Sequence, residues 1–296
     1  MTVQLEEAPA VDPAGAPVAS GRRARRSART GLSLGAASGL SLGVVVLWMS
    51  LLVLLPLAAV VGKAFGSGWH GFWSAVTQPE TRSAVLLTVV LALLVAMVNA
   101  VMGTLIAWVL VRERFRGSAI VEFVIDIPFA LPTVVAGLVM LALYGSDGAG
   151  PDLFGTRAGL AVALLFVTLP FTVRTVQPVL IDLDRDSEQA AASLGASSPV
   201  VFRRIVLPQL LPAIASGTAL AFARALGEYG SLVFISSAIP FKTEFAAQII
   251  YSKLQDSDHP AQATQQAAAI ATVLLLASVL VLVLLTIIER RVARRG

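Results

Sequence analysis

The sequence contains no cysteine and only two histidines among its 296 residues. The absence of cysteine excludes disulfide bonds and thiolate metal sites, and two histidines leave little for a histidine-rich metal centre. No Gly-x-x-x-x-Gly-Lys-Ser/Thr sequence occurs, so the chain carries no phosphate-binding loop of the ATPase type. We therefore expect that this chain is not itself an enzyme and that it binds no cofactor.

Apolar residues dominate what is present. Residues of the hydrophobic types make up 56% of the chain, charged residues only 14%, and the mean hydropathy is +0.82. This composition is too apolar for one soluble domain, and runs of about 20 apolar residues are typical of membrane-spanning helices. Six runs are expected to span: about 42–65, 84–111, 119–144, 158–180, 213–237 and 267–288. The predicted fold class is an all-α membrane protein with six transmembrane helices.

The distribution of basic residues predicts the orientation of these spans. One side carries fifteen arginines: Arg22, Arg23, Arg25, Arg26, Arg29, Arg112, Arg114, Arg116, Arg185, Arg203, Arg204, Arg290, Arg291, Arg294 and Arg295. The other side carries five basic residues: Lys63, Arg82, Arg157, Lys242 and Lys253. By the positive-inside rule the first side is cytoplasmic, so both termini are expected in the cytoplasm. The net charge of +4 fits such loops in contact with a lipid bilayer, and no nucleic-acid partner is expected.

The first 35 residues differ from the rest, because they are rich in Ala, Pro and Gly and include five arginines. We predict a disordered basic cytoplasmic tail over 1–35 and a six-helix transmembrane domain over 36–296. A cleaved secretory signal is the alternative. It is disfavoured because no small-residue cleavage site is evident and the following apolar run is long enough to span.

A patterned polar loop, predicted over 181–212, lies between the fourth and fifth spans and faces the cytoplasm. Asp186 and Gln189 have the Asp-x-x-Gln spacing of a capping box, which predicts a short alanine-rich helix. Gly195 suits the position just after the end of that helix. A smooth alanine face is what a helix needs to dock in a partner's groove.

A second short helix is predicted after the glycine turn, with Ser198 as N-cap and Pro199 at its first position. It is expected to end before Pro208, because proline disfavours helical geometry in the preceding residue. An interfacial amphipathic hairpin that merely joins two spans is the alternative to a docking element. A DNA-binding helix-turn-helix is disfavoured, because the unit is confined between membrane spans.

This loop resembles the "EAA" loop of ABC importer permeases, which reads Glu-Ala-Ala, three residues, Gly, nine residues, Ile-x-Leu-Pro. Six residues are in register: Ala190, Ala191, Gly195, Ile205, Leu207 and Pro208. The family's glutamate falls on Gln189, and Glu188 precedes it by one residue. The resemblance implies that the loop is the coupling helix, seated in a cleft of a cytoplasmic ATPase subunit.

Most of the chain resembles the sulfate/thiosulfate permeases within this family, through "DIPFALPTVVAGLVMLALYG", "LPFTVRTVQPVL", "FARALGEYGSLVFIS" and "PFKTE". The resemblance implies a type I importer permease of MetI-like architecture, in the bacterial inner membrane, that works by alternating access. It further implies a second homologous permease, two ATPase subunits that bind ATP-Mg, and a periplasmic or lipid-anchored sulfate-binding protein.

Two alternatives to a sulfate/thiosulfate permease stay open. Molybdate or tungstate permeases are similar, although they typically have Phe where Tyr229 stands. A channel or secondary transporter that is independent of an ATPase is the alternative from another class.

Ionisable residues within the spans are candidates for function, because they are costly in a membrane. The candidate translocation path or gate comprises Arg224, Glu228, Tyr229 and Ser231. Arg224 and Glu228 are four residues apart, so they can pair, and flanking glycines weaken the helix there. The alternatives are a structural pair inside the bundle, or a pair that holds the gate region without touching substrate.

Other polar residues of the spans are assigned to structure. Glu122 and Asp126 are expected at a helix end, and Arg174 is expected to reach the interface or to pair with Asp126. The tryptophans are expected to anchor the chain at the membrane interface: Trp48, Trp69, Trp73 and Trp108.

Overall fold

The structure, a computed structural model, describes residues 36–113 and 115–293, in which every regular element is a helix. The elements are α1 (Ala36–Met49), the π-helical η1 (Ser50–Leu54), α2 (Leu55–Ala64), α3 (Gly68–Thr77), α4 (Pro79–Arg112), α5 (Ser118–Ala130), α6 (Thr133–Tyr144), α7 (Arg157–Asp182), α8 (Asp186–Ser193), α9 (Ser198–Val201), the π-helical η2 (Phe202–Val206), α10 (Leu207–Leu226), α11 (Gly230–Val233), α12 (Ala246–Leu254) and α13 (Pro260–Ala293). The predicted tail over 1–35 lies outside the described residues.

The described residues divide after Leu51 into two units, which are considered separately. The first contains α1, whose apolar side chains are exposed over most of its length, as suits a helix that faces lipid. The first predicted span changes helix type beside a proline. The π-helical η1 directly precedes α2, which carries Pro56 in its first turn.

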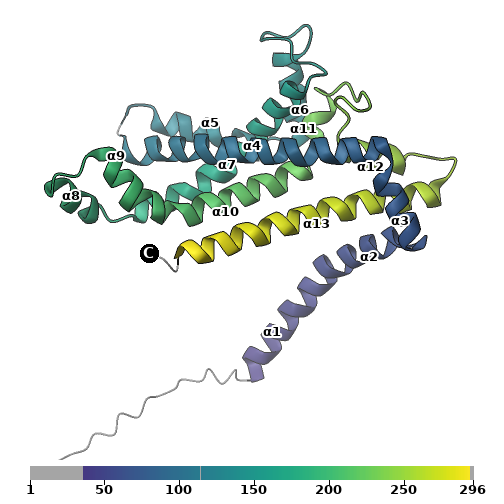
Figure 1. Cartoon of the computed structure of the whole chain (residues 1–296), viewed down its shortest axis with the longest axis horizontal. Coiled ribbons are helices and arrows are strands. Elements are labelled where there is room, and N and C mark those ends of the chain that lie inside the picture. Colours follow the sequence, from purple (N-terminus) through teal and green to yellow (C-terminus); the bar gives the residue numbers. More distant parts are fainter. Residues whose placement is uncertain (1–35, 114, 294–296) are drawn as a thin grey trace, which may run out of the picture. The chain divides into compact units, whose positions relative to one another are not determined.

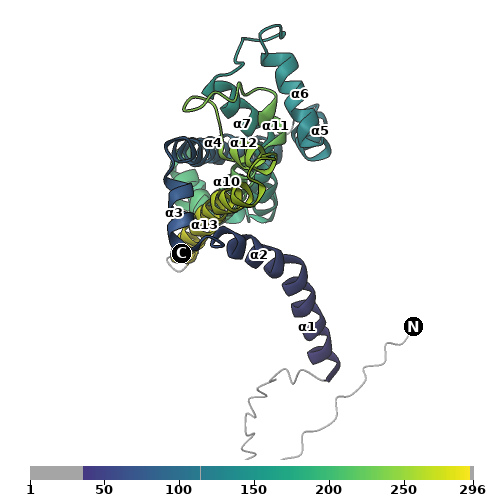
Figure 2. The ribbon, with the colours of Figure 1, turned by 90° about the vertical axis from the view of Figure 1, so that its right-hand side faces the viewer.

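The second unit, residues 52–293, is built on four long helices that run side by side, α4, α7, α10 and α13 (Figure 1). The view along the bundle shows α10 and α13 beneath α4 (Figure 2). α7 is the most buried of these four helices. In its most apolar stretch of 18 residues, 56% of the residues are buried within the protein, against 17% in the corresponding stretch of α13. α8 and α9 lie at one end of the bundle, whereas α3 and α12 lie at the other end (Figure 1).

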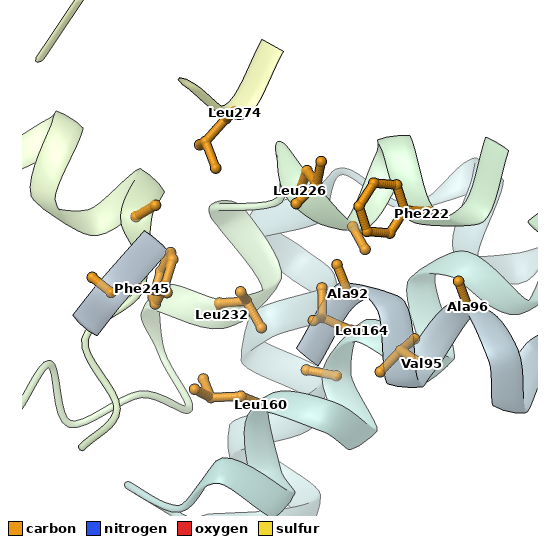
Figure 3. Close-up of a cluster of buried hydrophobic side chains, with 14 of the residues drawn as sticks. Ala92, Val95, Ala96, Leu160, Leu164, Phe222, Leu226, Leu232, Phe245 and Leu274 are labelled. Atoms are coloured by element: carbon orange, nitrogen blue, oxygen red, sulfur yellow. The ribbon is translucent and has the colours of Figure 1, made fainter. Parts of the chain in front are cut away.

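A large apolar cluster joins α4, α7 and α10 to α11, α12 and α13 (Figure 3). Ala92 and Ala96 of α4 face Leu160 and Leu164 of α7, and Phe222 of α10 closes the cluster from the other side. Small residues on α4 let large ones on its neighbours interdigitate, which is how membrane helices gain packing energy without a water-driven hydrophobic effect.

The closest approach of α4, α7 and α10 occurs at Thr172 of α7. A Cβ atom added to Gly103 of α4 would lie 2.8 Å from the Thr172 Cβ, and one added to Gly217 of α10 would lie 2.9 Å from the Thr172 Cα. Nearby, the Asn99 side-chain amide of α4 donates to the Thr168 hydroxyl at 2.8 Å. Because Gly103 and Gly217 have no side chains, α4 and α10 can both pack closely on α7.

The third predicted span is sharply bent. α5 and α6 together are long and apolar enough to cross a membrane, and they meet at an angle of 115°. The break lies at Leu131 and Pro132, which have extended backbones, whereas Pro128 stays inside α5. Five other helical segments pass the same test of length and composition, so six spans are confirmed on that criterion when the bent pair counts as one.

The fifth predicted span is wrong at both ends. The predicted stop before Pro208 does not occur, because helix continues from Ser198 to Leu226. The π-helical η2 precedes Pro208, and its wider turn accommodates a residue that has no N–H and a bulky ring. At the other end α10 stops at Leu226, well before the predicted end at 237, and Gly227 forms its C-cap.

Adding a methyl group at the close contact with Thr172 tests this packing. We expect Gly217→Ala to lower the melting temperature of the purified protein in detergent, because the added methyl group meets the fixed backbone of α7. The cost is about 1–3 kcal/mol, as for other overpacked cores. Gly62→Ala is the matched control, since nothing lies within 4 Å of a Cβ at that position of α2. An equal melting temperature for both variants would contradict the contact.

Candidate coupling and translocation sites

The loop between the fourth and fifth spans contains the predicted short helix, α8, which runs from Asp186 to Ser193. The predicted capping box is wrong, because Asp186 lies inside the helix and Arg185 is the N-cap residue. The Asp184 carboxylate, two residues earlier, takes the capping role, since its Oδ1 accepts the backbone N–H of Asp186 at 2.9 Å. Asp186 and Glu188 instead place negative charge in the first turn, where it interacts favourably with the positive end of the helix dipole and stabilises the helix.

α8 ends in the glycine turn that the sequence predicts. Gly195 has φ +88°, a backbone conformation that strongly favours glycine. The Gly195 N–H donates to the Ala192 carbonyl at 2.9 Å, and the Ala196 N–H donates to the Ala191 carbonyl at 3.0 Å. These two bonds form a Schellman motif, so the turn after α8 is fixed by its own backbone.

The second short helix begins one residue earlier than predicted. Ser197 occupies the N-cap position, and its side chain makes no capping hydrogen bond. Ser198 and Pro199 form the first turn of α9, which continues through η2 into α10. The hairpin from α8 to α10 is therefore one short exposed helix set against the N-terminal extension of a membrane span.

An ion pair joins α8 to the end of α4. The Arg112 Nη2 atom lies 2.5 Å from Glu188 Oε1, and the two side chains are only 8% and 20% exposed. The Arg112 guanidinium also lies over the Trp108 ring, 5.3 Å from its centroid. Trp108 meets Phe202 of η2 edge to face at 5.2 Å. The pair is therefore shielded from water and fixes α8 to the end of a membrane span.

A hollow of about 360 Å³ lies between α8 and the end of α4. Its lining comprises Trp108, Glu188, Gln189, Ala192, Ala196, Ser198, Val201, Phe202 and Val206. α8 contributes Glu188, Gln189 and Ala192 to this lining, and the rings of Trp108 and Phe202 contribute its aromatic part. A side chain from a partner could enter here without displacing any part of the chain.

The structure brings the predicted coupling residues to this end of the bundle. Gln189 and Ala190 are exposed and Ala191 is half-buried. Ile205 lies in η2, whereas Leu207 and Pro208 form the first turn of α10. Glu188, one position before the family's glutamate, is the residue that forms the ion pair, and the Gln189 side chain lines the hollow.

Sequence reasoning missed Arg112 as a partner of the loop, and it assigned Trp108 to an interface anchor. Both lie in the last turns of α4, and Phe202 completes the set from η2. The i,i+4 spacing of Trp108 and Arg112 at the end of a span was the available signal. Nothing in the spacing pointed to Glu188, because 76 residues separate it from Arg112.

The predicted translocation residues gather where α10 ends. Arg224 Nη1 lies 2.5 Å from Glu228 Oε2, which confirms the predicted pair, although Glu228 lies beyond the end of α10. The Glu228 side chain is 1% exposed, and its Oε1 accepts the backbone N–H of Ser231 at 2.8 Å. The carboxylate therefore bridges the last turn of α10 and the first turn of α11.

Tyr229 and Ser231 lie on either side of this turn. The Tyr229 ring packs against Tyr251 and Phe245, with centroids 5.0 and 6.1 Å away. Ser231 is fully buried. Because Glu228 already accepts the Ser231 N–H, this donor is not free for an anion.

The "PFKTE" motif, residues 240–244, forms a hydrogen-bonded turn after α11. Arg157 of α7 donates to the Lys242 and Phe241 carbonyls at 3.0 and 3.3 Å. Burial and the neighbouring Glu80 carboxylate raise the pKa of Glu244 to about 7. In residues 36–113 and 115–293 no three His, Asp or Glu side chains lie together in a way that could hold a metal ion.

The model of the family "Binding-protein-dependent transport system inner membrane component" matches residues 99–294. This match contains α8, the glycine turn, η2 and the Glu228 turn. It therefore covers both candidate sites and two thirds of the chain.

Curated relatives match nearly the whole chain. The sulfate transport system permease protein CysT of Salmonella typhimurium is 41% identical over 84% of this chain and 91% of its own length. The protein of the same name from Synechocystis is 43% identical over 83% of this chain and 87% of its own. The Escherichia coli protein is 40% identical, with 84% and 91% covered.

Solved structures show the same fold at lower identity. A bacterial ABC transporter involved in alginate import matches with a TM-score of 0.69 at 16% identity, over 86% of this chain and 94% of its own. An amino acid ABC transporter matches with a TM-score of 0.54 at 17% identity, over 74% and 98%. The chain, with its long apolar helices, is a multi-pass inner-membrane protein, and it belongs to the family of binding-protein-dependent transport system inner membrane components, the permeases of ABC importers.

Proposed function

We propose that this chain is the permease subunit of an ATP-driven sulfate/thiosulfate importer. The observation that carries the proposal is the exposed α8, held to the end of a membrane span by the buried Arg112–Glu188 pair, in a chain about 40% identical to sulfate permeases. Those relatives favour sulfate over the molybdate or tungstate alternative. The docking helix favours an ATPase-driven importer over a channel or secondary transporter.

α8 is the element proposed to receive the movement of the ATPase. Its exposed Ala190 presents little bulk to a partner, and Leu194 at its end is 90% exposed. Force on α8 passes to α4 through Arg112 and to α10 through η2, since both elements line the same hollow. A rigid turn at Gly195 prevents the motion from being absorbed within the loop.

The proposed assembly contains a second homologous permease, two ATPase subunits that bind ATP-Mg, and a periplasmic or lipid-anchored sulfate-binding protein. The arginine distribution supports a cytoplasmic position for both termini. The C-terminal ends of α4 and α13 lie at the same end of the second unit as α8, which agrees with this orientation (Figure 1). Sulfate crosses by alternating access, and this chain supplies no catalytic group.

Arg224 and Glu228 are proposed to hold the gate rather than to bind the anion. Arg224 faces a carboxylate at 2.5 Å, which offsets its charge, and Glu228 would repel a dianion. Their shared role is to fix the turn at Tyr229 against α6 and α12. The anion-binding donors are then expected from a surface that the second permease completes.

Sulfate uptake is the direct test of substrate. We expect deletion of this chain to abolish radiolabelled sulfate uptake in its host, and reintroduction of the gene to restore it. Excess unlabelled sulfate or thiosulfate should compete, whereas molybdate at equal concentration should compete far less. Uptake that survives deletion, or that molybdate inhibits as well as sulfate does, would contradict the proposed substrate.

The Arg112–Glu188 pair gives a test of coupling. We expect Glu188→Gln to reduce sulfate uptake by about tenfold or more while the protein still inserts, because it leaves the buried Arg112 charge uncompensated. Glu113→Gln is the matched control, since Glu113 is exposed at the end of the same helix. The double variant Arg112→Glu with Glu188→Arg should recover part of the uptake. Normal uptake by Glu188→Gln would show that the pair does not couple α8 to the spans.

A further inference from the structure

The two halves of the bent pair α5 and α6 contact different neighbours in the second unit. The first half packs on α7, where the Phe129 ring meets the Phe171 ring edge to face at 5.0 Å. The second half packs mainly on α11 and also contacts α7. Only Leu131 and Pro132 separate the two halves. A movement of α5 relative to α7 is therefore carried by a short elbow to α6.

Arg174 of α7 makes the strongest polar contact to α5. Its Nε donates to Asp126 Oδ1 at 2.8 Å, and its Nη2 pairs with Asp126 Oδ2, so the pair is bidentate. Nη1 donates to Gln177 Oε1 at 2.8 Å, and the Gln177 amide donates to Glu122 Oε1 at 3.2 Å. Every guanidinium nitrogen thus has an acceptor, and Arg174 is engaged with the protein rather than available to an anion.

This network lies within a membrane span, eight residues before α7 ends, or about 12 Å at 1.5 Å per residue. The Arg174 and Asp126 side chains are nevertheless 33% and 44% exposed. Partly exposed charges at that depth are expected to face a water-filled cavity or a protein partner, not lipid. Because water can reach both partners, the pair can open and close more readily than a fully buried one.

The other half of the bent pair touches the turn that carries Glu228. A Cβ atom added to Gly137 of α6 would lie 2.6 Å from the Gly230 carbonyl oxygen and 3.2 Å from the Ser231 Cα. Ser231 is the residue whose N–H the Glu228 carboxylate accepts. The backbone of α6 at Gly137 therefore packs directly on the backbone of the Glu228 turn, and the Phe234 ring lies beside the same contact.

We propose that the Arg174–Asp126 pair is a latch that sets the position of the α5–α6 elbow and, through α6, the position of the Glu228 turn during transport. This inference rests on the proposed importer function and deepens it. Arg174 is a positioning residue that touches no substrate. Its closed state, seen here, holds α5 against α7, and release lets the elbow and the Glu228 turn move together.

The test measures the number of sulfate ions imported per ATP hydrolysed by the whole complex in proteoliposomes, with the binding protein present. We expect Arg174→Lys to lower this ratio about tenfold while binding-protein-stimulated ATP hydrolysis stays within about twofold of wild type, since lysine keeps the charge but loses the bidentate geometry. Arg157→Lys is the matched control at the start of the same helix, where the arginine donates only to backbone carbonyls.

A second variant keeps the inference falsifiable if Arg174→Lys assembles poorly. Asp126→Arg combined with Arg174→Asp restores an ion pair, and we expect it to recover at least part of the transport ratio that either single change removes. An assembled Arg174→Lys complex with the wild-type ratio would overturn the latch, as would equal losses of transport and ATP hydrolysis. If the wild-type complex itself imports no sulfate, the proposed function fails instead.

Discussion

The close contact of α4, α7 and α10 at Thr172 is the constraint on which the rest of the second unit depends. Gly103 and Gly217 allow three backbones to approach where any side chain would separate them. In a membrane such contact replaces the water-driven burial that stabilises soluble proteins. Each of the three helices then carries one functional element: α4 ends at Arg112, α7 carries Arg174, and α10 ends at the Glu228 turn.

The charged side chains within the spans are constrained as well, because each needs a partner. Arg174 and Arg224 each meet a carboxylate, and the buried Glu228 also accepts a backbone N–H. An unpaired charge at these positions would be prohibitive, so the pairs constrain which helix positions are compatible with the membrane. The Arg224–Glu228 pair lies where α10 ends, whereas the Arg174–Asp126 pair joins the interiors of α7 and α5 close to the bend between α5 and α6. Stability and the capacity to move are therefore concentrated at the same few residues.

The sequence was most informative where period and spacing carry the signal. Apolar runs predicted the spans because hydropathy over about 20 residues reflects a bilayer thickness. The glycine turn after α8 followed from Gly195, since few other residues adopt φ +88°. The Arg224–Glu228 and Asp126–Arg174 pairs were foreseen because charges inside a span must find partners.

Other features could not be predicted from the sequence because they depend on distant packing. Pro208 predicts a helix end, yet η2 absorbs it, and nothing local distinguishes these outcomes. The Glu188–Arg112 pair joins a loop helix to the end of a distant span, and Asp184, two residues before Asp186, takes the predicted capping role of Asp186. The 115° angle of the bend at Pro132 depends on the packing of α5 on α7 and of α6 on α11, which local sequence does not encode.

Docking of α8 onto an ATPase subunit is the central claim, and site-specific cross-linking tests it most directly. The chain has no cysteine, so a single introduced thiol is unambiguous. Leu194→Cys places a thiol at the exposed end of α8, and Trp69→Cys places one on α3 at the opposite end of the bundle, where the native side chain is 67% exposed. The account predicts that a short thiol-reactive cross-linker joins the ATPase subunit to position 194 and not to position 69. Failure at position 194 in an assembled complex, or equal cross-linking at both, would contradict it.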